Sequence, residues 1–282
     1  MARSYLFIPG NVPRMLQNMD VYDADVIIID LEDAIAIEEK DEARFLTCEF
    51  LRAHRPENLP ILIRINSDED SLMRADLMAI KGLDITGIVL PKTSLAQLER
   101  FTSMKPTNTT DLEIYGLIET PEAFFELDKI AKHPRIKGLM LGGEDLSTHT
   151  NIDKSLDEIA FHMPKSLLNF AAKAAQKEAI DTPVSSLDDA ALIQGIKQTK
   201  TFGFDGKLAI HPNQVPLINT HLAPSKTAIH EARRIIIAHE KKGSMRFSLD
   251  GKMIDKPIIQ RAQKLLDKAH RYGLLAGDAH AL

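Results

Sequence analysis

Short apolar runs alternate with longer amphipathic stretches along most of this chain of 282 residues. Most runs are rich in Ile, Val or Leu and show no regular in–out alternation, which is typical of parallel strands buried on both faces. We predict eight strands, the last two mainly from their spacing. They cover residues 5–8, 26–31, 61–65, 87–90, 113–118, 138–141, 179–182 and 206–210.

The stretches between these strands indicate helices. Residues 41–54 gather apolar side chains on one face, and Pro121 opens a helix at 121–132 with Thr120 as its expected N-cap. Eight alternations of strand and helix predict an α/β fold, a closed (β/α)8 barrel. An open doubly wound sheet is the alternative, although no G-x-G-x-x-G follows the first strand to indicate dinucleotide binding. Further helices are predicted at 165–177 and 186–199.

The last part of the chain has a different pattern. Two helical stretches, 225–242 and 257–272, flank a short mixed segment at 243–255. We therefore predict a barrel domain at 1–224 and a helical extension at 225–282. The extension is expected to cover the barrel mouth or to reach a neighbouring subunit.

Charge and composition exclude several classes of partner. The net charge of −5 gives no general attraction to nucleic acid or to an anionic membrane, and no apolar run is long enough to span a bilayer. Cys48 is the only cysteine, so the chain cannot form an internal disulfide. No signal-like apolar region stands apart from the first strand. We expect a cytoplasmic protein that binds neither nucleic acid nor membrane.

Ionisable residues follow many of the predicted strands, where barrel enzymes place their active sites. Several carboxylates on one small rim repel one another unless a cation lies among them. Oxygen ligands without a Cys/His cluster favour Mg²⁺ over zinc, and Mg²⁺ keeps positions open for a chelating 2-keto or 2-hydroxy acid. The residues concerned are Asp30, Glu32, Asp33, Arg64, Lys92, Glu119, Glu144 and Asp145.

Each of these residues also has a structural interpretation. Glu119 lies near the start of the helix predicted at Pro121, where the helix dipole favours an acid, and the alternative for Asp145 is that it caps a helix beginning near Leu146. The two glycines before Asp145, Gly142 and Gly143, indicate a backbone that approaches another group closely. Lys92 is either a solvated charge at a strand end or a contact for phosphate or thioester.

Arg64 has two possible roles, because a guanidinium on an apolar strand needs a partner. It forms an ion pair with Glu32 or Asp33, or its planar fork binds a substrate carboxylate. We favour the substrate.

Several sequence blocks recur in one known family. They are Arg3-Ser4-x-Leu6-Phe7-x-Pro9-Gly10-Asn11, Asp30-Leu31-Glu32-Asp33-Ala34, Arg64-Ile65-Asn66, Leu90-Pro91-Lys92-Thr93, Ile118-Glu119-Thr120-Pro121, Gly142-Gly143-Glu144-Asp145, Gly203-Phe204-Asp205-Gly206-Lys207, His211-Pro212-Asn213-Gln214 and Asp250-Gly251-Lys252-Met253-Ile254-Asp255. In order and spacing, over nearly the whole chain, they resemble the citrate lyase beta subunit of the HpcH/HpaI aldolase family.

The resemblance implies a barrel of the phosphoenolpyruvate-binding type, commonly a homotrimer. It implies that Glu119 and Asp145 hold Mg²⁺ and that Arg64 binds the keto acid. Asp30, Glu32 and Asp33 are implied to lie near the metal and its waters. A late aspartate supplied by a neighbouring subunit, here Asp255, is implied to act on the acyl methyl carbon.

The implied reaction is cleavage of a 3-hydroxyacyl thioester, such as a citryl thioester, to oxaloacetate and an acetyl thioester. The carrier is coenzyme A or an acyl carrier protein, and other citrate lyase subunits are possible partners. We expect Arg64 and the amides of Gly142 and Gly143 to orient the substrate carboxylate.

Departures from the family pattern leave the acyl substrate open; they lie at 147–151, 162–165, 182–185 and 210–212. The alternatives are a malyl-CoA or citramalyl-CoA lyase, a malate synthase-type enzyme and, in another class, a non-catalytic paralogue.

Overall fold

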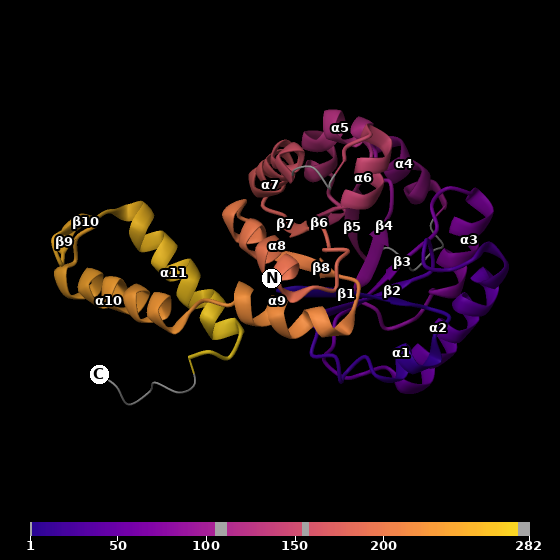
Figure 1. Ribbon diagram of the computed structural model, residues 1–282, viewed down its shortest axis with the longest axis horizontal. Coiled ribbons are helices and arrows are strands. Elements are labelled where there is room, and N and C mark those ends of the chain that lie inside the picture. Colours follow the sequence, from indigo (N-terminus) through magenta and orange to yellow (C-terminus); the bar gives the residue numbers. More distant parts are fainter. Residues whose placement is uncertain (1, 105–111, 154–157, 276–282) are drawn as a thin grey trace. The chain divides into compact units, whose positions relative to one another are not determined.

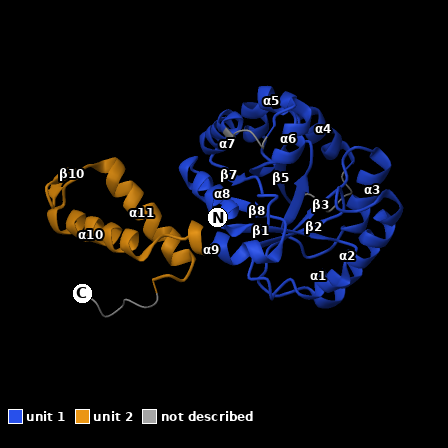
Figure 2. Cartoon of the chain, viewed as in Figure 1, with its two compact units in different colours: residues 1–219 blue, residues 220–282 orange. Residues whose placement is uncertain are grey.

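The computed structural model describes residues 2–104, 112–153 and 158–275. The chain divides into two compact units, residues 1–219 and 220–282 (Figure 2). The division falls inside helix α9 (Val215–Leu222), slightly before the domain boundary predicted at residue 224. The part that the extension plays at the barrel mouth or on a neighbouring subunit stays a prediction.

The first unit is a closed barrel of eight parallel strands (Figure 1). Each strand pairs with the next, and the eighth closes on the first, with Tyr5 opposite Leu208. The predicted (β/α)8 barrel is therefore confirmed, including its two weakest strands. The strands are β1 (Ser4–Pro9), β2 (Val26–Asp30), β3 (Ile61–Arg64), β4 (Gly87–Leu90), β5 (Glu113–Ile118), β6 (Ile136–Leu141), β7 (Glu178–Asp181) and β8 (Gly206–Ala209).

Helices surround this barrel (Figure 1). They are α1 (Pro13–Gln17), α2 (Lys40–His54), α3 (Asp70–Ala79), α4 (Leu95–Met104), α5 (Pro121–Lys132), α6 (Gly143–Thr150), α7 (His162–Ala174), α8 (Asp189–Thr201) and α9, with 3₁₀ turns η1 (Ile37–Glu39), η2 (Glu158–Phe161) and η3 (Pro212–Gln214).

The predicted helices differ from the observed ones mainly at their ends. The Thr120 hydroxyl accepts the Ala123 amide and caps α5 as predicted. The helix predicted from residue 186 instead begins after Asp188, whose side chain accepts the Ala191 amide and caps α8.

Alternate strand residues fill the inside of the barrel. Near one end the rings of Tyr5 and Tyr115 lie 6.1 Å apart, and Tyr5 donates a hydrogen bond to Glu178. A packed interior leaves the ends of the barrel, not its axis, for a substrate. The interior cluster is Tyr5, Val26, Ile28, Leu62, Val89, Tyr115, Leu117, Met140, Ile180 and Leu208.

The second unit contains α10 (Lys226–Lys242), a hairpin of β9 (Phe247–Leu249) and β10 (Lys252–Ile254), and α11 (Lys256–Arg271). The segment 243–255, which the sequence indicated only as short and mixed, contains the two strands of this hairpin. Asp250 and Gly251 both have positive φ, the conformation of a two-residue hairpin turn. The hairpin packs Phe247 and Ile254 against the apolar sides of both helices.

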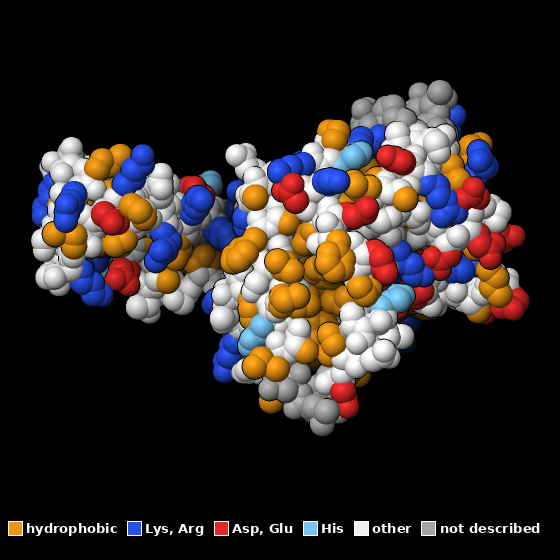
Figure 3. All heavy atoms as spheres, turned by 90° about the horizontal axis from the view of Figure 1, so that it is seen from above, with side chains coloured by type: hydrophobic (Ala, Val, Ile, Leu, Met, Phe, Trp, Pro, Cys, Tyr) orange, Lys and Arg blue, Asp and Glu red, His pale blue; other side chains and the backbone are white. Residues whose placement is uncertain are grey.

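Several large apolar side chains are exposed on the barrel unit, and one of its faces gathers hydrophobic groups (Figure 3). On α7, Met163, Leu167 and Phe170 recur at helical spacing, and on α5, which packs against α7, Phe125 is exposed. Within the described residues, no helix combines the length and hydrophobicity needed to cross a membrane.

Candidate active site

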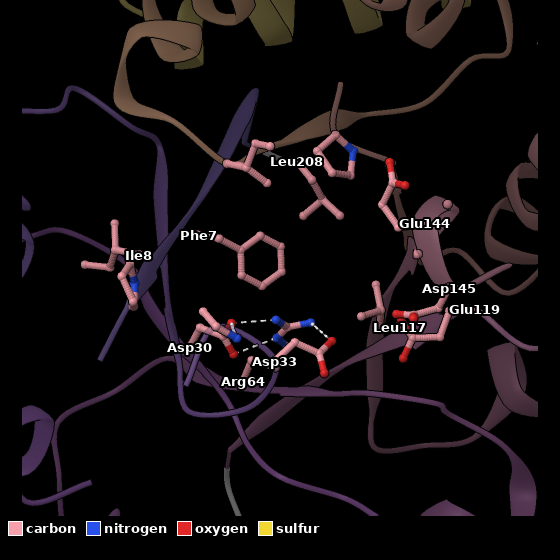
Figure 4. Close-up of a pocket in the computed structure, with 16 residues that line it drawn as sticks. Phe7, Ile8, Asp30, Asp33, Arg64, Leu117, Glu119, Glu144, Asp145 and Leu208 are labelled. Carbon is pink, nitrogen blue, oxygen red and sulfur yellow. Dashed lines mark hydrogen bonds and ion pairs between the residues drawn. The ribbon is translucent and has the colours of Figure 1, made fainter. Parts of the chain in front are cut away.

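A cavity of about 300 Å³ lies at the carboxyl ends of the barrel strands (Figure 4). Its lining combines apolar side chains with five carboxylates and one guanidinium, so its formal charge is strongly negative. The lining residues are Phe7, Ile8, Pro9, Asp30, Asp33, Ala34, Arg64, Leu117, Glu119, Gly142, Gly143, Glu144, Asp145, Pro183, Leu208 and Ile210.

Arg64, the last residue of β3, reaches into this cavity (Figure 4). Its Nε lies 2.7 Å from Asp30 Oδ1 and its Nη2 2.5 Å from Asp30 Oδ2. Its Nη1 lies 3.1 Å from Glu32 Oε2 and 3.3 Å from Asp33 Oδ2. The ion pairs that were the alternative to substrate binding are thus present, Asp30 is an additional partner, and the substrate role of Arg64 stays a prediction. Its guanidinium also lies 4.9 Å from the Phe7 ring.

Asp30 is itself fixed by the turn that follows β2. Its carboxylate accepts the backbone amides of Glu32 and Ala34 at 2.9 and 3.1 Å. These bonds explain why an acid ends a strand whose other residues are apolar. The turn fixes the carboxylate, and the carboxylate fixes the guanidinium.

Glu32 is only 5% exposed, although it does not itself line the cavity. No described group donates a hydrogen bond to either of its oxygens, despite the nearby Arg64. Burial raises the pKa of Glu32 to about 8. The positive charge of Arg64 lowers this pKa, and the negative charges of Asp33 and Asp30 raise it. A buried carboxylate without hydrogen bonds is costly, and such a group is typical of a functional site.

Glu119 follows β5 and is 2% exposed. The backbone amide of Lys92 donates to its Oε1 at 2.7 Å. Burial raises the pKa of Glu119 well above its usual range, and the negative charges of Glu32 and Asp145 raise it further. A cation among these carboxylates would reverse that effect and keep them ionised.

Asp145 lies in the first turn of α6 and lines the same cavity as Glu119 (Figure 4), close enough for its charge to act on Glu119. The alternative that Asp145 caps this helix is not observed, because Gly142 occupies the N-cap position. The described residues include no group of three or more His, Cys, Asp or Glu able to hold a metal. A pair of carboxylates nevertheless fits Mg²⁺, which commonly takes one or two and keeps water or substrate elsewhere.

Gly142 and Gly143 make room for neighbouring side chains. A Cβ on Gly142 would lie 2.4 Å from Glu119 Oε2, and one on Gly143 2.5 Å from Thr182 Oγ1. Their amides donate to the Ile118 carbonyl and the Thr182 hydroxyl, both at 3.0 Å. Both glycines line the cavity, but these amides are already used within the chain. The close approach that the sequence indicated is therefore to Glu119 and Thr182.

Lys92 and Asp255, like Glu32, are predicted site residues that do not line the cavity. The ammonium of Lys92 lies 2.5 Å from Asp68, and the contribution of Lys92 to the site is its backbone amide, held at a φ of +48°. Asp255 belongs to the second unit, where its side chain accepts the Ile258 amide at 3.2 Å and caps α11. Asp255 therefore has a structural role as the cap of α11, and its catalytic role stays a prediction.

Two contributors to the site, Phe7 and Thr182, were not predicted from the sequence. Phe7 lies in the middle of the cavity (Figure 4), although its position in an apolar strand indicated only core packing. Thr182 holds the start of α6, and nothing in its sequence context indicated a partner 39 positions earlier in the chain.

Comparison with known proteins agrees with this geometry. The model of the HpcH/HpaI aldolase/citrate lyase family matches residues 3–212. The chain belongs to this family. The HpcH/HpaI match spans every barrel strand and all the cavity residues described above, and membership confirms the prediction of a lyase.

Members of the HpcH/HpaI family align with nearly the whole chain. The citrate lyase subunit beta of Haemophilus influenzae is 32% identical, over 95% of this chain and 97% of the relative. A (3S)-malyl-CoA thioesterase of Cereibacter sphaeroides is 33% identical, over 95% and 94%. The structure of CitE from Mycobacterium tuberculosis, in complex with magnesium, acetoacetate and coenzyme A, superposes with a TM-score of 0.80 at 26% identity, covering 95% of this chain and 98% of CitE.

Proposed function

We propose that this protein is a Mg²⁺-dependent lyase that cleaves a 3-hydroxy-3-carboxyacyl thioester into a keto acid and a shorter acyl thioester. A citryl thioester, giving oxaloacetate and an acetyl thioester, is the substrate we favour. The observation that carries the proposal is the pairing of Glu119 and Asp145 in one cavity with Arg64. Acidic groups for a cation and a guanidinium for a carboxylate together suit a chelating 2-hydroxy acid.

Glu119 and Asp145 are the residues we assign to the metal. The CitE structure, which contains magnesium, supports the choice of metal. Bound Mg²⁺ would supply Lewis-acid stabilisation of the alkoxide that forms when the substrate hydroxyl loses its proton. The Lys92 amide donates a hydrogen bond to Glu119, and the missing Cβ of Gly142 leaves room for the Glu119 carboxylate beside it.

Arg64 binds the substrate carboxylate in this proposal. Asp30 fixes the Nε side of the guanidinium, while Nη1 lies 3.1 Å from Glu32 and 3.3 Å from Asp33 at the cavity. Phe7 provides an apolar wall beneath it. Such a charged, planar group orients the acid portion of the substrate before cleavage.

Two proton transfers complete the reaction. The substrate hydroxyl loses its proton as the carbon–carbon bond breaks. The electron pair of that carbon–carbon bond passes to the acyl fragment, which becomes a thioester enolate. Glu32, which accepts no hydrogen bond from a described donor, is our candidate to take that proton, with Asp33 at the more exposed rim. The enolate carbon then takes a proton from Asp255, which we expect a neighbouring subunit to supply.

We propose that the enzyme is a homo-oligomer, in line with the trimer implied by the resemblance. The exposed apolar side chains Met163, Leu167 and Phe170 on one face of α7 support self-association. Light scattering should give a mass above one subunit, and Phe170→Asp should lower it. A cytoplasmic location is part of the same proposal.

The carrier and the acyl group are tested by direct assay. Citryl-, malyl- and citramalyl-CoA, and citryl-acyl carrier protein, would be supplied in parallel with Mg²⁺, and keto acid and free thiol would be measured separately. We expect keto acid from a citryl thioester. Thiol release from malyl-CoA without a keto acid would instead indicate the hydrolysis named for the Cereibacter relative.

The metal assignment needs variants that conserve shape. Glu119→Gln and Asp145→Asn should each abolish calorimetric Mg²⁺ binding and cleavage, whereas Glu178→Gln, at the opposite end of the barrel, should alter neither. Cleavage that survives either site variant, or that proceeds fully in EDTA, contradicts the proposal.

A further inference from the structure

The loop after β7 contacts the start of α6 at two adjacent residues. Thr182 Oγ1 accepts the Gly143 amide at 3.0 Å, and the Ser185 hydroxyl donates to Glu144 Oε1. The next residue along α6 is Asp145. Gly143 and Glu144, the two residues before Asp145, therefore attach the first turn of α6 to the loop after β7.

Thr182 is in turn held by a buried ion pair. Its carbonyl accepts Lys207 Nζ at 2.7 Å, and its amide donates to Asp181 Oδ1 at 3.0 Å. Lys207 and Asp181 are both buried and lie 3.2 Å apart across β8 and β7. Lys165 at 3.6 Å from Asp181 completes the cluster.

The cluster does not line the catalytic cavity, so a direct role in substrate binding does not explain it. The two lysines keep the pKa of Asp181 low, against the effect of burial, so Asp181 stays ionised. Buried charges of this kind are rigid when satisfied. The carbonyl and amide of Thr182 are bonded to this cluster, and its hydroxyl is bonded to the Gly143 amide, so the cluster restrains the start of α6 through Thr182.

We propose that Thr182, supported by Lys207 and Asp181, is a positioning residue that sets Mg²⁺ affinity by fixing the first turn of α6 and hence Asp145. This inference rests on the metal site assigned above. Groups that orient a metal ligand typically change metal affinity when removed, even though they never touch the metal.

The test is calorimetric Mg²⁺ binding without substrate. Thr182→Val removes the hydroxyl and should raise the Mg²⁺ Kd roughly 10- to 100-fold. Thr182→Ser keeps it and should bind like the wild type. Thr182→Ala carries the same prediction as Thr182→Val if the latter does not fold.

Thr86 provides a matched control. Its hydroxyl accepts the Ile61 amide at 3.2 Å, but it precedes β4 and so lies at the amino ends of the strands. Thr86→Val should lower the melting temperature much as Thr182→Val does, while leaving the Mg²⁺ Kd unchanged.

The outcomes separate this inference from the proposed function. If the wild type binds Mg²⁺ and both Thr182→Val and Thr182→Ala bind it equally well, the positioning role is wrong and the metal site stands. If Thr86→Val weakens binding as much, the effect is general destabilisation and the role is again wrong. If the wild type binds no Mg²⁺ in a Glu119-dependent way, the proposed function itself fails.

Discussion

Asp30 binds one side of the Arg64 guanidinium through both carboxylate oxygens: Oδ1 lies 2.7 Å from Nε and Oδ2 lies 2.5 Å from Nη2. The turn after β2 fixes Asp30 through two backbone amides, so the guanidinium has little freedom to turn. A lysine could not make both contacts from one ammonium. Charge alone is therefore insufficient at this position.

Arg64→Lys should weaken binding of the keto acid about tenfold or more, because about 1.4 kcal/mol of lost contact corresponds to a factor of ten. It should also lower the free energy of unfolding by about 2 kcal/mol, since Asp30 loses a hydrogen-bonded partner. Oxaloacetate titration and urea unfolding measure the two effects separately.

Arg3 and Asp25 form a matched pair outside the cavity, at 2.7 and 2.9 Å. Arg3→Lys should reduce stability without changing keto-acid affinity. Equal affinity losses in both variants would mean that Arg64 acts only through the fold.

Gly142→Ala should impair the metal site through a steric effect. The added Cβ would lie 2.4 Å from Glu119 Oε2, although the backbone at φ −87° accepts alanine. We expect the Mg²⁺ Kd to rise roughly tenfold or more, as for displaced metal ligands. Gly82→Ala is the control, because its φ of +78° costs about 1 kcal/mol but no atom lies near the new Cβ. Unchanged Mg²⁺ binding in Gly142→Ala would show that Glu119 can move freely.

The metal-free protein should lose stability as pH rises. The folded-state pKa of Glu32 is raised from 4.5 to about 8, so between these values the folded protein holds a proton that the unfolded chain has released. The free energy of unfolding then falls by about 1.4 kcal/mol per pH unit for this group. Urea unfolding in EDTA across that window measures the slope. Glu32→Gln should reduce the slope without abolishing it, because the pKa of Glu119 is raised as well, and an identical slope in that variant would place the titration elsewhere.

Hydrophobic runs predicted six of the eight strands, and the last two were predicted mainly from their spacing. β7 and β8 gave weak signals because they carry the charged residues Asp181 and Lys207, which neutralise each other only after the strands pair. The hairpin of the second unit was missed although its Asp250-Gly251 turn was visible in the sequence. Its strands are too short for a clear alternation.

The site could be predicted as a set of residues but not as a set of contacts. Strand-end positions indicated Arg64, Glu119 and Asp145, because parallel strands bring their carboxyl ends together. The partner of the Gly143 amide, Thr182, depends on how the β7 loop turns, which no periodic pattern encodes.

Lys92→Ala should leave both Mg²⁺ and substrate affinities unchanged. The ammonium of Lys92 pairs with the exposed Asp68, while the backbone amide that holds Glu119 survives the substitution. Isothermal titration with Mg²⁺ and KM for the thioester measure the two affinities. A raised KM for the thioester alone would restore the substrate-binding role that the sequence suggested.

Asp255 can be separated into a capping role and a chemical role. Its carboxylate caps α11 by accepting the Ile258 amide, and asparagine caps helices about as well as aspartate. Asp255→Asn should therefore keep the melting temperature and the Mg²⁺ Kd but lose most of kcat, because an amide cannot deliver the proton.

Asp255→Ala should lose both kcat and about 1 kcal/mol of stability through the missing cap. Ser225, whose side chain accepts the Ala228 amide and caps α10, gives the control: Ser225→Ala should lose stability alone. If Asp255→Asn turns over like the wild type, Asp255 is a cap only, and the proton for the acyl carbon comes from another group.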